Sequence, residues 1–142
     1  MVFHDRGEDV ETAWCAPLAK RHHYRLDNVL FLHATPAYGD VVEAVEDPRF
    51  AGRLTCRRIV KAGGRHVAIV DYPKAAQLGK LTRLLRERFD AICEGCFGPR
   101  AGVSGRVHIA LPARHEAKAV FAEVAAALPG LELIHPAARR GK

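Results

Sequence analysis

Short runs in which apolar and polar residues alternate fill the first half of the chain, and no stretch there keeps a helical period. Alternation with a period of two is the pattern of a half-buried strand. The predicted strands span residues 11–17, 23–29, 40–45 and 53–61. Four or five such strands, separated by turn-forming residues, predict a small β-barrel or a curled antiparallel sheet.

The second half of the chain changes to a helical period. After Pro73, apolar residues recur at helical spacing at Leu78, Leu81, Leu85 and Phe89. This pattern predicts an amphipathic helix. A second apolar stripe predicts another helix, formed by Ala117, Val120, Phe121, Val124 and Leu128. Alternating or apolar runs predict strands over residues 65–72, 91–97, 106–111 and 131–135.

Between the two halves, Ala62-Gly63-Gly64 predicts a hairpin turn, because glycine adopts the positive φ angles of tight hairpins. From residue 65 the predicted order is strand, helix, strand, strand, helix, strand, which is the order of a ferredoxin-like βαββαβ sandwich. We therefore predict an α+β fold with a β-rich N-terminal subdomain (1–64), a ferredoxin-like subdomain (65–136) and a flexible tail (137–142).

The composition fits one small folded protein. The chain has 142 residues, of which 49% are hydrophobic and 27% charged, enough to bury a core. Its first twelve residues are rich in charge, unlike a signal peptide, and its apolar runs are too short to span a bilayer. Four cysteines without an export signal indicate reduced thiols. We expect a cytoplasmic protein without a membrane partner.

The net charge of +6 is unevenly distributed along the chain. Residues 1–64 contain nine basic and nine acidic residues, whereas residues 65–142 contain thirteen basic and seven acidic residues. A basic half permits an anionic partner, either nucleic acid or an acidic protein surface. The alternative is a solvated surface with no such partner.

Three segments between residues 14 and 44 carry a resemblance to a known family. They are Trp14-Cys15-Ala16-Pro17-Leu18, Tyr24-Arg25-Leu26-Asp27-Asn28-Val29 and Tyr38-Gly39-Asp40-Val41-Val42-Glu43-Ala44. In this order and spacing they resemble the signature of a bacterial family known only as domain of unknown function 4265. The chain departs from that signature where Leu30, not proline, precedes Phe31. The resemblance implies a bacterial origin and this architecture, and it implies no activity because the family has none assigned.

Cys93 and Cys96 have the spacing of half a zinc site. A complete site would need further ligands to converge from Cys15, Cys56, His22, His23 or His108. No second pair at ligand spacing exists, so free thiols are the alternative. We expect no cofactor, and Cys93 and Cys96 are weak metal candidates.

A glycine-rich loop at residues 95–105 is compatible with an anionic ligand. Four glycines and the nearby Arg100 and Arg106 could direct donors at a phosphate. However, this loop joins two predicted strands, whereas phosphate loops usually precede a helix. A flexible hairpin connection is the alternative.

The exposed face of the predicted C-terminal sheet offers a second route to nucleic acid. Alternation that turns Val67, Ile69, Val107 and Ile109 inward turns His66, Arg106 and His108 outward. RNA-recognition modules use this face through stacking aromatic residues, and residues 106–111 contain none. The alternative is that the N-terminal strands cover the face.

A cluster of ring and polar residues in the first half predicts a recognition patch for a protein partner. Its members are Tyr24, Asp27, Asn28, Tyr38 and Asp40. Asp27 and Asn28 could instead simply build a turn, and we expect Trp14 to lie in the core. No pair of residues suggests an acid and a base, and Ser104, the single serine, lacks a nucleophile motif.

These observations favour a non-enzymatic protein-binding module over a catalyst. The most concrete form is a small bacterial inhibitor, such as an immunity-type protein that neutralises a cognate toxin. The alternative is an RNA-associated or nucleotide-associated protein that uses Arg100, Arg106, His108 and the basic helix at residues 80–88.

Overall fold

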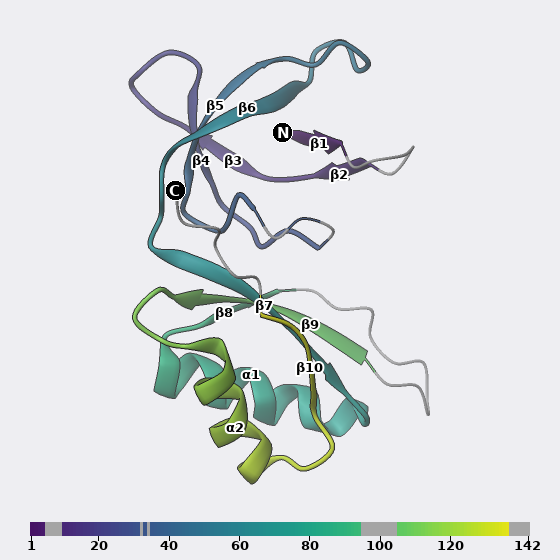
Figure 1. The fold of residues 1–142 in the computed structure, drawn as a ribbon. Coiled ribbons are helices and arrows are strands. Elements are labelled where there is room, and N and C mark those ends of the chain that lie inside the picture. The colour runs from purple at the N-terminus through teal and green to yellow at the C-terminus, as the bar shows by residue number, and fades with distance from the viewer. Residues whose placement is uncertain (5–9, 32, 34, 95–104, 137–142) are drawn as a thin grey trace. The chain divides into compact units, whose positions relative to one another are not determined.

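The computed structural model describes residues 1–4, 10–31, 33, 35–94 and 105–136. The chain divides into two compact units, Met1–Arg65 and His66–Lys142. The first unit contains a sheet, and the second contains a sheet and two helices, so the predicted α+β class is confirmed (Figure 1). The predicted tail, 137–142, lies outside the described residues. Neither described helix is long and apolar enough to cross a bilayer.

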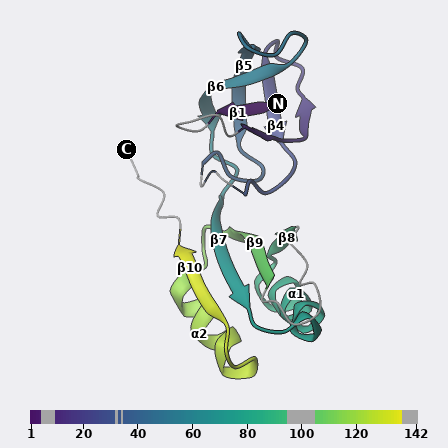
Figure 2. The same ribbon diagram turned by 90° about the vertical axis from the view of Figure 1, so that its right-hand side faces the viewer.

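The N-terminal unit is one curled six-stranded sheet, as Figures 1 and 2 show. Its strands lie side by side in the order β2-β1-β6-β5-β4-β3. Neighbours are antiparallel except β1 and β6, which run parallel. The strand bounds are β1 Val2–His4, β2 Val10–Thr12, β3 Cys15–Pro17, β4 His23–Leu26, β5 Val41–Glu46 and β6 Leu54–Lys61. The predicted curled sheet is therefore observed, with β1 as an additional strand.

The predicted strand at 11–17 is a bent segment that forms both β2 and β3, at opposite ends of the strand order. At the bend, Ala13 N donates to Met1 O (2.8 Å), and the Met1 ammonium group donates to Ala13 O (2.7 Å). Phe3, Ala13, Leu26 and Leu30 form the buried core beneath this bend. The bend allows one stretch of chain to serve both ends of the sheet.

The predicted hairpin at Ala62-Gly63-Gly64 is wrong. β6 pairs with β1 and β5, whereas β7 (Arg65–Tyr72) belongs to the second sheet. Gly63 is held by Asp40, whose Oδ1 accepts the Gly63 N–H at 2.6 Å. The glycines therefore carry the chain from one sheet into the next, although their positive-φ preference resembled that of a hairpin.

The C-terminal unit has the element order strand, helix, strand, strand, helix, strand. Its sheet has the order β10-β7-β9-β8, and Figure 1 shows both helices on the same side of that sheet. Besides β7, the element bounds are α1 Ala75–Phe89, β8 Ile92–Glu94, β9 Gly105–Pro112, α2 Ala117–Ala127 and β10 Glu132–Pro136. Every predicted element of this half is thus present. Residues 95–97 of the strand predicted at 91–97 lie outside the described residues.

Helix α1 forms where its apolar spacing predicted it. It begins after Lys74, whose backbone N–H donates to the Gln77 side chain at 3.2 Å. It buries Leu81, Leu85 and Phe89, and it ends at Asp90, which has a φ of 52°. The buried stripe, rather than a strong cap, holds this helix on the sheet.

The inward face of β7 differs from the prediction by one residue. Ala68, Val70 and Tyr72 join the helix-covered core, and Val67 and Ile69 lie on the other face. The run is apolar at both parities, so alternation alone could not settle its direction. Asp71 settles it, because its carboxylate binds Arg106 of β9 on the face away from the core.

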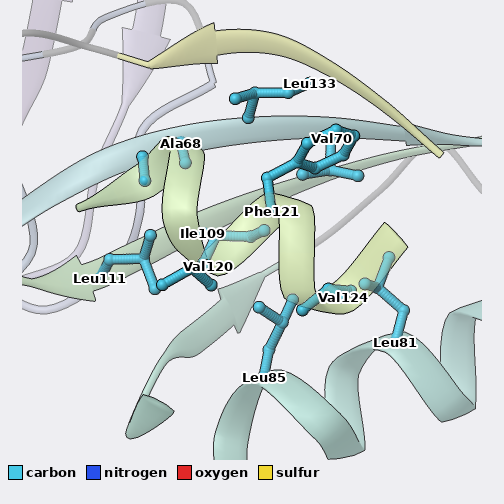
Figure 3. A pocket seen from close by; sticks show the side chains of 11 residues that line it. Ala68, Val70, Leu81, Leu85, Ile109, Leu111, Val120, Phe121, Val124 and Leu133 are labelled. Atoms are coloured by element: carbon cyan, nitrogen blue, oxygen red, sulfur yellow. The ribbon is translucent and has the colours of Figure 1, made fainter. Parts of the chain in front are cut away.

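The core between sheet and helices is filled by apolar side chains. Figure 3 shows Leu81, Leu85, Val120 and Val124 of the helices around a cavity of about 10 Å³. That volume corresponds to roughly one water-sized sphere, and its lining is apolar. This cavity therefore offers no room for a ligand.

Candidate functional site

Trp14 is 81% exposed, so its predicted place in the core is wrong. It lies at the bend between β2 and β3, where its backbone N–H donates to Asn28 Oδ1 (2.8 Å) and its carbonyl accepts from Asp27 N (3.0 Å). Ala13 is buried and Cys15 is half-buried. Since neighbouring side chains of an extended segment alternate, Trp14 is turned outward.

Trp14 borders a hollow of about 280 Å³ on the N-terminal unit. We call this feature the Trp14 hollow; it is lined by Met1, Thr12, Ala13, Trp14, Cys15, Tyr24, Arg53 and Leu54. Tyr24 is half-buried in it, and Arg53 is exposed. Tryptophan, tyrosine and arginine are the residue types most enriched at the energetic centres of protein interfaces. The hollow therefore combines all three types at one place.

Of the predicted recognition patch, only Tyr24 contributes to this hollow. Asp27 is exposed, and its Oδ1 accepts a long hydrogen bond from the Tyr38 hydroxyl (3.4 Å). The Tyr38 ring also lies under the Arg65 guanidinium, 6.0 Å from the ring centroid. Asn28 fixes the backbone of Trp14. Asn28 thus positions the site through the main chain.

Asp40 is 2% exposed, and its contacts are those of a structural residue. Its Oδ2 accepts the Ala37 N–H at 2.9 Å, and its Oδ1 accepts the Gly63 N–H. Both carboxylate oxygens are therefore engaged with the backbone. This placement corrects the expectation that Asp40 belongs to a recognition surface.

A second hollow, of about 390 Å³, lies elsewhere on the same unit. It is lined by His33 and Cys56 among others, and His33 Nδ1 lies 3.1 Å from the buried Glu11 carboxylate. Burial raises the pKa of the Cys56 thiol to about 11, and the nearby Cys15 and Asp40 contribute to the increase. Cys56 is therefore a protonated thiol at neutral pH, which is a poor nucleophile.

The predicted anion-binding residues of the second half are differently placed. Arg106 makes two hydrogen bonds to Asp71, at 2.7 and 2.9 Å, and this hydrogen bonding raises the pKa of Arg106. His108 is buried, with 3% exposure, so it is not the exposed contact residue that alternation predicted. Arg100 lies outside the described residues. The side-chain placements of Arg106 and His108 thus differ from those of a free anion-binding pair.

Of the predicted metal pair, the structure describes only Cys93, which is buried. Cys96 lies outside the described residues. Within the described part of the chain, no group of three or more His, Cys, Asp or Glu residues could hold a metal ion. The described side chains therefore do not complete the predicted half-site around Cys93.

The Trp14 hollow was missed from the sequence because a lone tryptophan in an apolar run usually marks a core. The alternation of residues 13–15 was the available signal, since small Ala13 and Cys15 suit the inside of a narrow, curled sheet. Arg53, from the turn before β6, carried no local signal. None of the family models, curated proteins or solved structures compared with this chain matches it.

Proposed function

We propose that this chain is a non-enzymatic protein-binding module that contacts its partner through the Trp14 hollow. The observation that carries the proposal is the 81% exposure of Trp14 beside Tyr24 and Arg53. Exposing a large aromatic ring to water is unfavourable, and its burial against a partner releases the apolar hydration free energy. An exposed tryptophan at a hollow is therefore a natural anchor for another protein.

The most concrete form of this proposal is a small cytosolic bacterial inhibitor, such as an immunity-type protein that neutralises a toxin. The resemblance to domain of unknown function 4265 supports a bacterial origin. We also propose a ferredoxin-like arrangement for the C-terminal unit. It is supported by the strand order β10-β7-β9-β8 with two helices on one face.

The proposal is tested by capturing the partner and then measuring its affinity. Tagged protein is incubated with lysate of the native organism, with and without nuclease, and the captured partner is purified. Trp14→Ala should weaken binding of that partner by at least about 2 kcal/mol. The same substitution should change the free energy of unfolding by less than about 0.5 kcal/mol, because the ring is exposed.

Ile134→Ala is the matched control, since Ile134 is also exposed, at 40%, but lies in the other unit. It should leave the affinity within about twofold of the wild-type value. Equal affinities of the wild type and Trp14→Ala would contradict the proposal. Recovery of RNA alone, lost at high salt, would replace it with the RNA-associated alternative.

A further inference from the structure

The outward face of the N-terminal sheet carries two adjacent rows of side chains across β4, β5 and β6. In one row, Arg25 pairs with Val41 and Val41 pairs with Lys61. In the next row, His23 pairs with Glu43 and Glu43 pairs with Arg58. Directly paired residues of antiparallel strands project from the same face. The two rows therefore form one surface.

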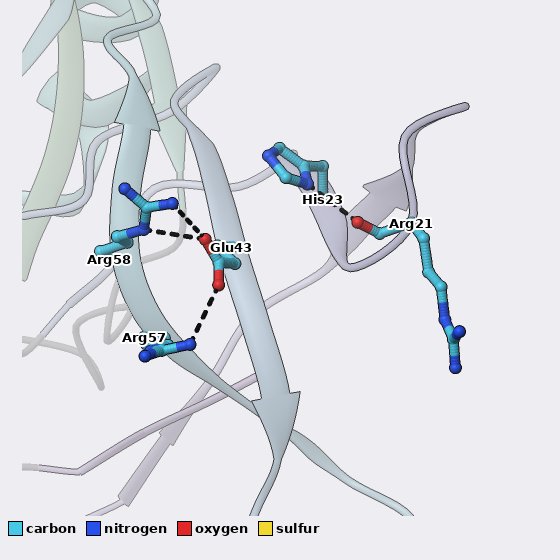
Figure 4. A network of polar contacts seen from close by, with 5 residues as sticks. All are labelled: Arg21, His23, Glu43, Arg57 and Arg58. Atoms are coloured by element: carbon cyan, nitrogen blue, oxygen red, sulfur yellow. Dashed lines mark hydrogen bonds and ion pairs between the residues drawn. The ribbon is translucent and has the colours of Figure 1, made fainter.

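Glu43 lies at the centre of this surface, between two arginines (Figure 4). Its carboxylate accepts from Arg58 Nε at 2.8 Å and pairs with Arg57 Nη1 at 3.3 Å. The hydrogen bond from Arg58 lowers the pKa of Glu43. The Glu43 side chain is 17% exposed, whereas those of Arg57 and Arg58 are 65% and 66% exposed. The arginines therefore cover the carboxylate and present their charge to solvent.

Four basic residues thus surround one carboxylate, and we call them the basic platform: Arg25, Arg57, Arg58 and Lys61. Arg25 and Lys61 are exposed, and within the described residues neither has an acidic partner. The platform is strongly positive although residues 1–64 are neutral by count. Folding, rather than composition, concentrates the charge on this face.

The chemistry of the platform favours an acidic protein segment over nucleic acid. Guanidinium groups bind carboxylates and phosphates alike in a bidentate manner, so charge alone does not distinguish the two kinds of partner. Neither row contains a phenylalanine, tyrosine or tryptophan on which a base could stack, and the ring of His23 is buried, at 8% exposure.

In the same row, one ring nitrogen of His23 has no hydrogen-bond partner among the described residues. Its Nδ1 donates to the Arg21 carbonyl at 2.9 Å, which leaves Nε2 of the neutral ring as an acceptor. His23 is 8% exposed, and among the described residues its Nε2 has no partner. This nitrogen is enclosed within the unit, so it offers no contact to a segment bound on the surface.

We propose that the basic platform binds an acidic segment of the partner protein. This inference rests on the protein-binding function proposed above and adds the chemistry of the partner. The Trp14 hollow would supply apolar anchoring, and the platform would supply charge complementarity, which mainly sets the association rate and the choice of partner.

The test uses a fluorescent poly-glutamate peptide of about twelve residues as the probe, with affinity measured by anisotropy at low salt. The triple variant Arg25→Gln, Arg57→Gln, Lys61→Gln keeps the Arg58–Glu43 pair and should bind the peptide at least about tenfold more weakly. The control Lys80→Gln, Arg83→Gln, Lys118→Gln removes the same charge from exposed helix positions. It should change the affinity by less than about twofold.

Glu43→Gln provides a change of the opposite sign and should strengthen peptide binding by about twofold or more. Equal losses in the two triple variants would overturn the proposal, because net charge alone would explain them. Tighter binding of a single-stranded oligonucleotide of equal charge, with the same dependence on the platform, would also overturn it.

The failure of this inference can be told apart from the failure of the proposed function. If Trp14→Ala abolishes binding of the captured partner but the platform variant binds it normally, only the acidic-partner inference fails. If the platform variant loses the poly-glutamate peptide while Trp14→Ala leaves partner binding intact, the hollow is not the anchor and the platform still stands.

Discussion

Asp40 connects separate parts of the N-terminal unit through its two carboxylate oxygens. These oxygens accept backbone N–H groups from Ala37 and Gly63, and the Asp40 carbonyl accepts from Leu26 N at 2.9 Å. A buried carboxylate is stable only when such donors replace water. A single side chain therefore holds the β4–β5 connection against the end of β6.

Asp40→Ala would leave two backbone donors without their acceptor. We expect it to lower the free energy of unfolding by about 2–6 kcal/mol, since each of the two unsatisfied buried groups costs about 1–3 kcal/mol. Urea denaturation followed by circular dichroism measures this change. The control Asp27→Ala, on an exposed carboxylate, should stay within about 0.5 kcal/mol. Similar stabilities for the two variants would show that Asp40 is not a structural residue.

The thiols of Cys15 and Cys56 are a second residue-scale feature with a measurable consequence. Burial raises the pKa of both thiols, and that of Cys56 reaches about 11. At pH 8 we expect iodoacetamide to alkylate Cys56 more slowly in the folded protein than in urea. Mass spectrometry of the Cys56 peptide follows the reaction, and equal rates in both conditions would contradict the half-buried placement of this thiol.

The same pKa shift fixes the direction of a pH effect on stability. An unfolded cysteine titrates near pH 8.5, so the unfolded chain loses its thiol proton before the folded chain does. The contribution of Cys56 is therefore fully present below that value. It is lost as the pH rises toward 11.

At the scale of elements, the connection after β6 and the helix α1 use glycine in opposite ways. A Cβ on Gly63 would lie 2.2 Å from the carbonyl carbon of Gly39 and 2.6 Å from Asp40 N. A Cβ on Gly79, inside α1, would meet nothing within 4 Å. The backbone approach requires glycine at the first position, whereas the helix does not require it at the second.

The same substitution should therefore change stability in opposite directions at these two sites. Gly63→Ala should destabilise the protein by more than about 2 kcal/mol, because backbone atoms must move apart. Gly79→Ala should stabilise it by roughly 0.5–1 kcal/mol through helix propensity. Urea melts of both variants, each compared with the wild type, test the pair. Stabilisation by Gly63→Ala would mean that the close approach to Gly39 does not exist.

The elements that sequence analysis located correctly are those with sustained periodicity. Helix α1 repeats its apolar residues at helical spacing from Leu78 to Phe89, and β7 keeps an apolar run from Val67 to Val70. Strand β1 was missed because three residues are too few to show a period. The hairpin was wrongly predicted because glycine conformation reports the local turn and not the strand that the chain joins next.

At the scale of the whole molecule, burial decides which charged side chains reach the surface, and a count along the sequence cannot show this. Glu11, Asp40 and Asp47 are all less than 8% exposed. Asp47, for example, accepts the backbone N–H groups of Arg49 and Phe50 at 2.8 and 3.0 Å. Some acidic residues of the first half are thus buried and hold turns, while the described arginines of that half are exposed. For this reason the basic platform does not follow from composition.

The bent segment that forms both β2 and β3 also bears on aggregation. Unpaired strand edges are templates on which a second molecule can extend a sheet, and short edges reduce that hazard. Here the two outermost strands of the six-stranded sheet are three residues each, and Pro17 in β3 lacks an N–H to donate. Because the same piece of chain is divided between the two ends, neither end offers a long ladder among the residues that the structure describes. Edge-to-edge association through this sheet is therefore disfavoured, although the same unit exposes Trp14.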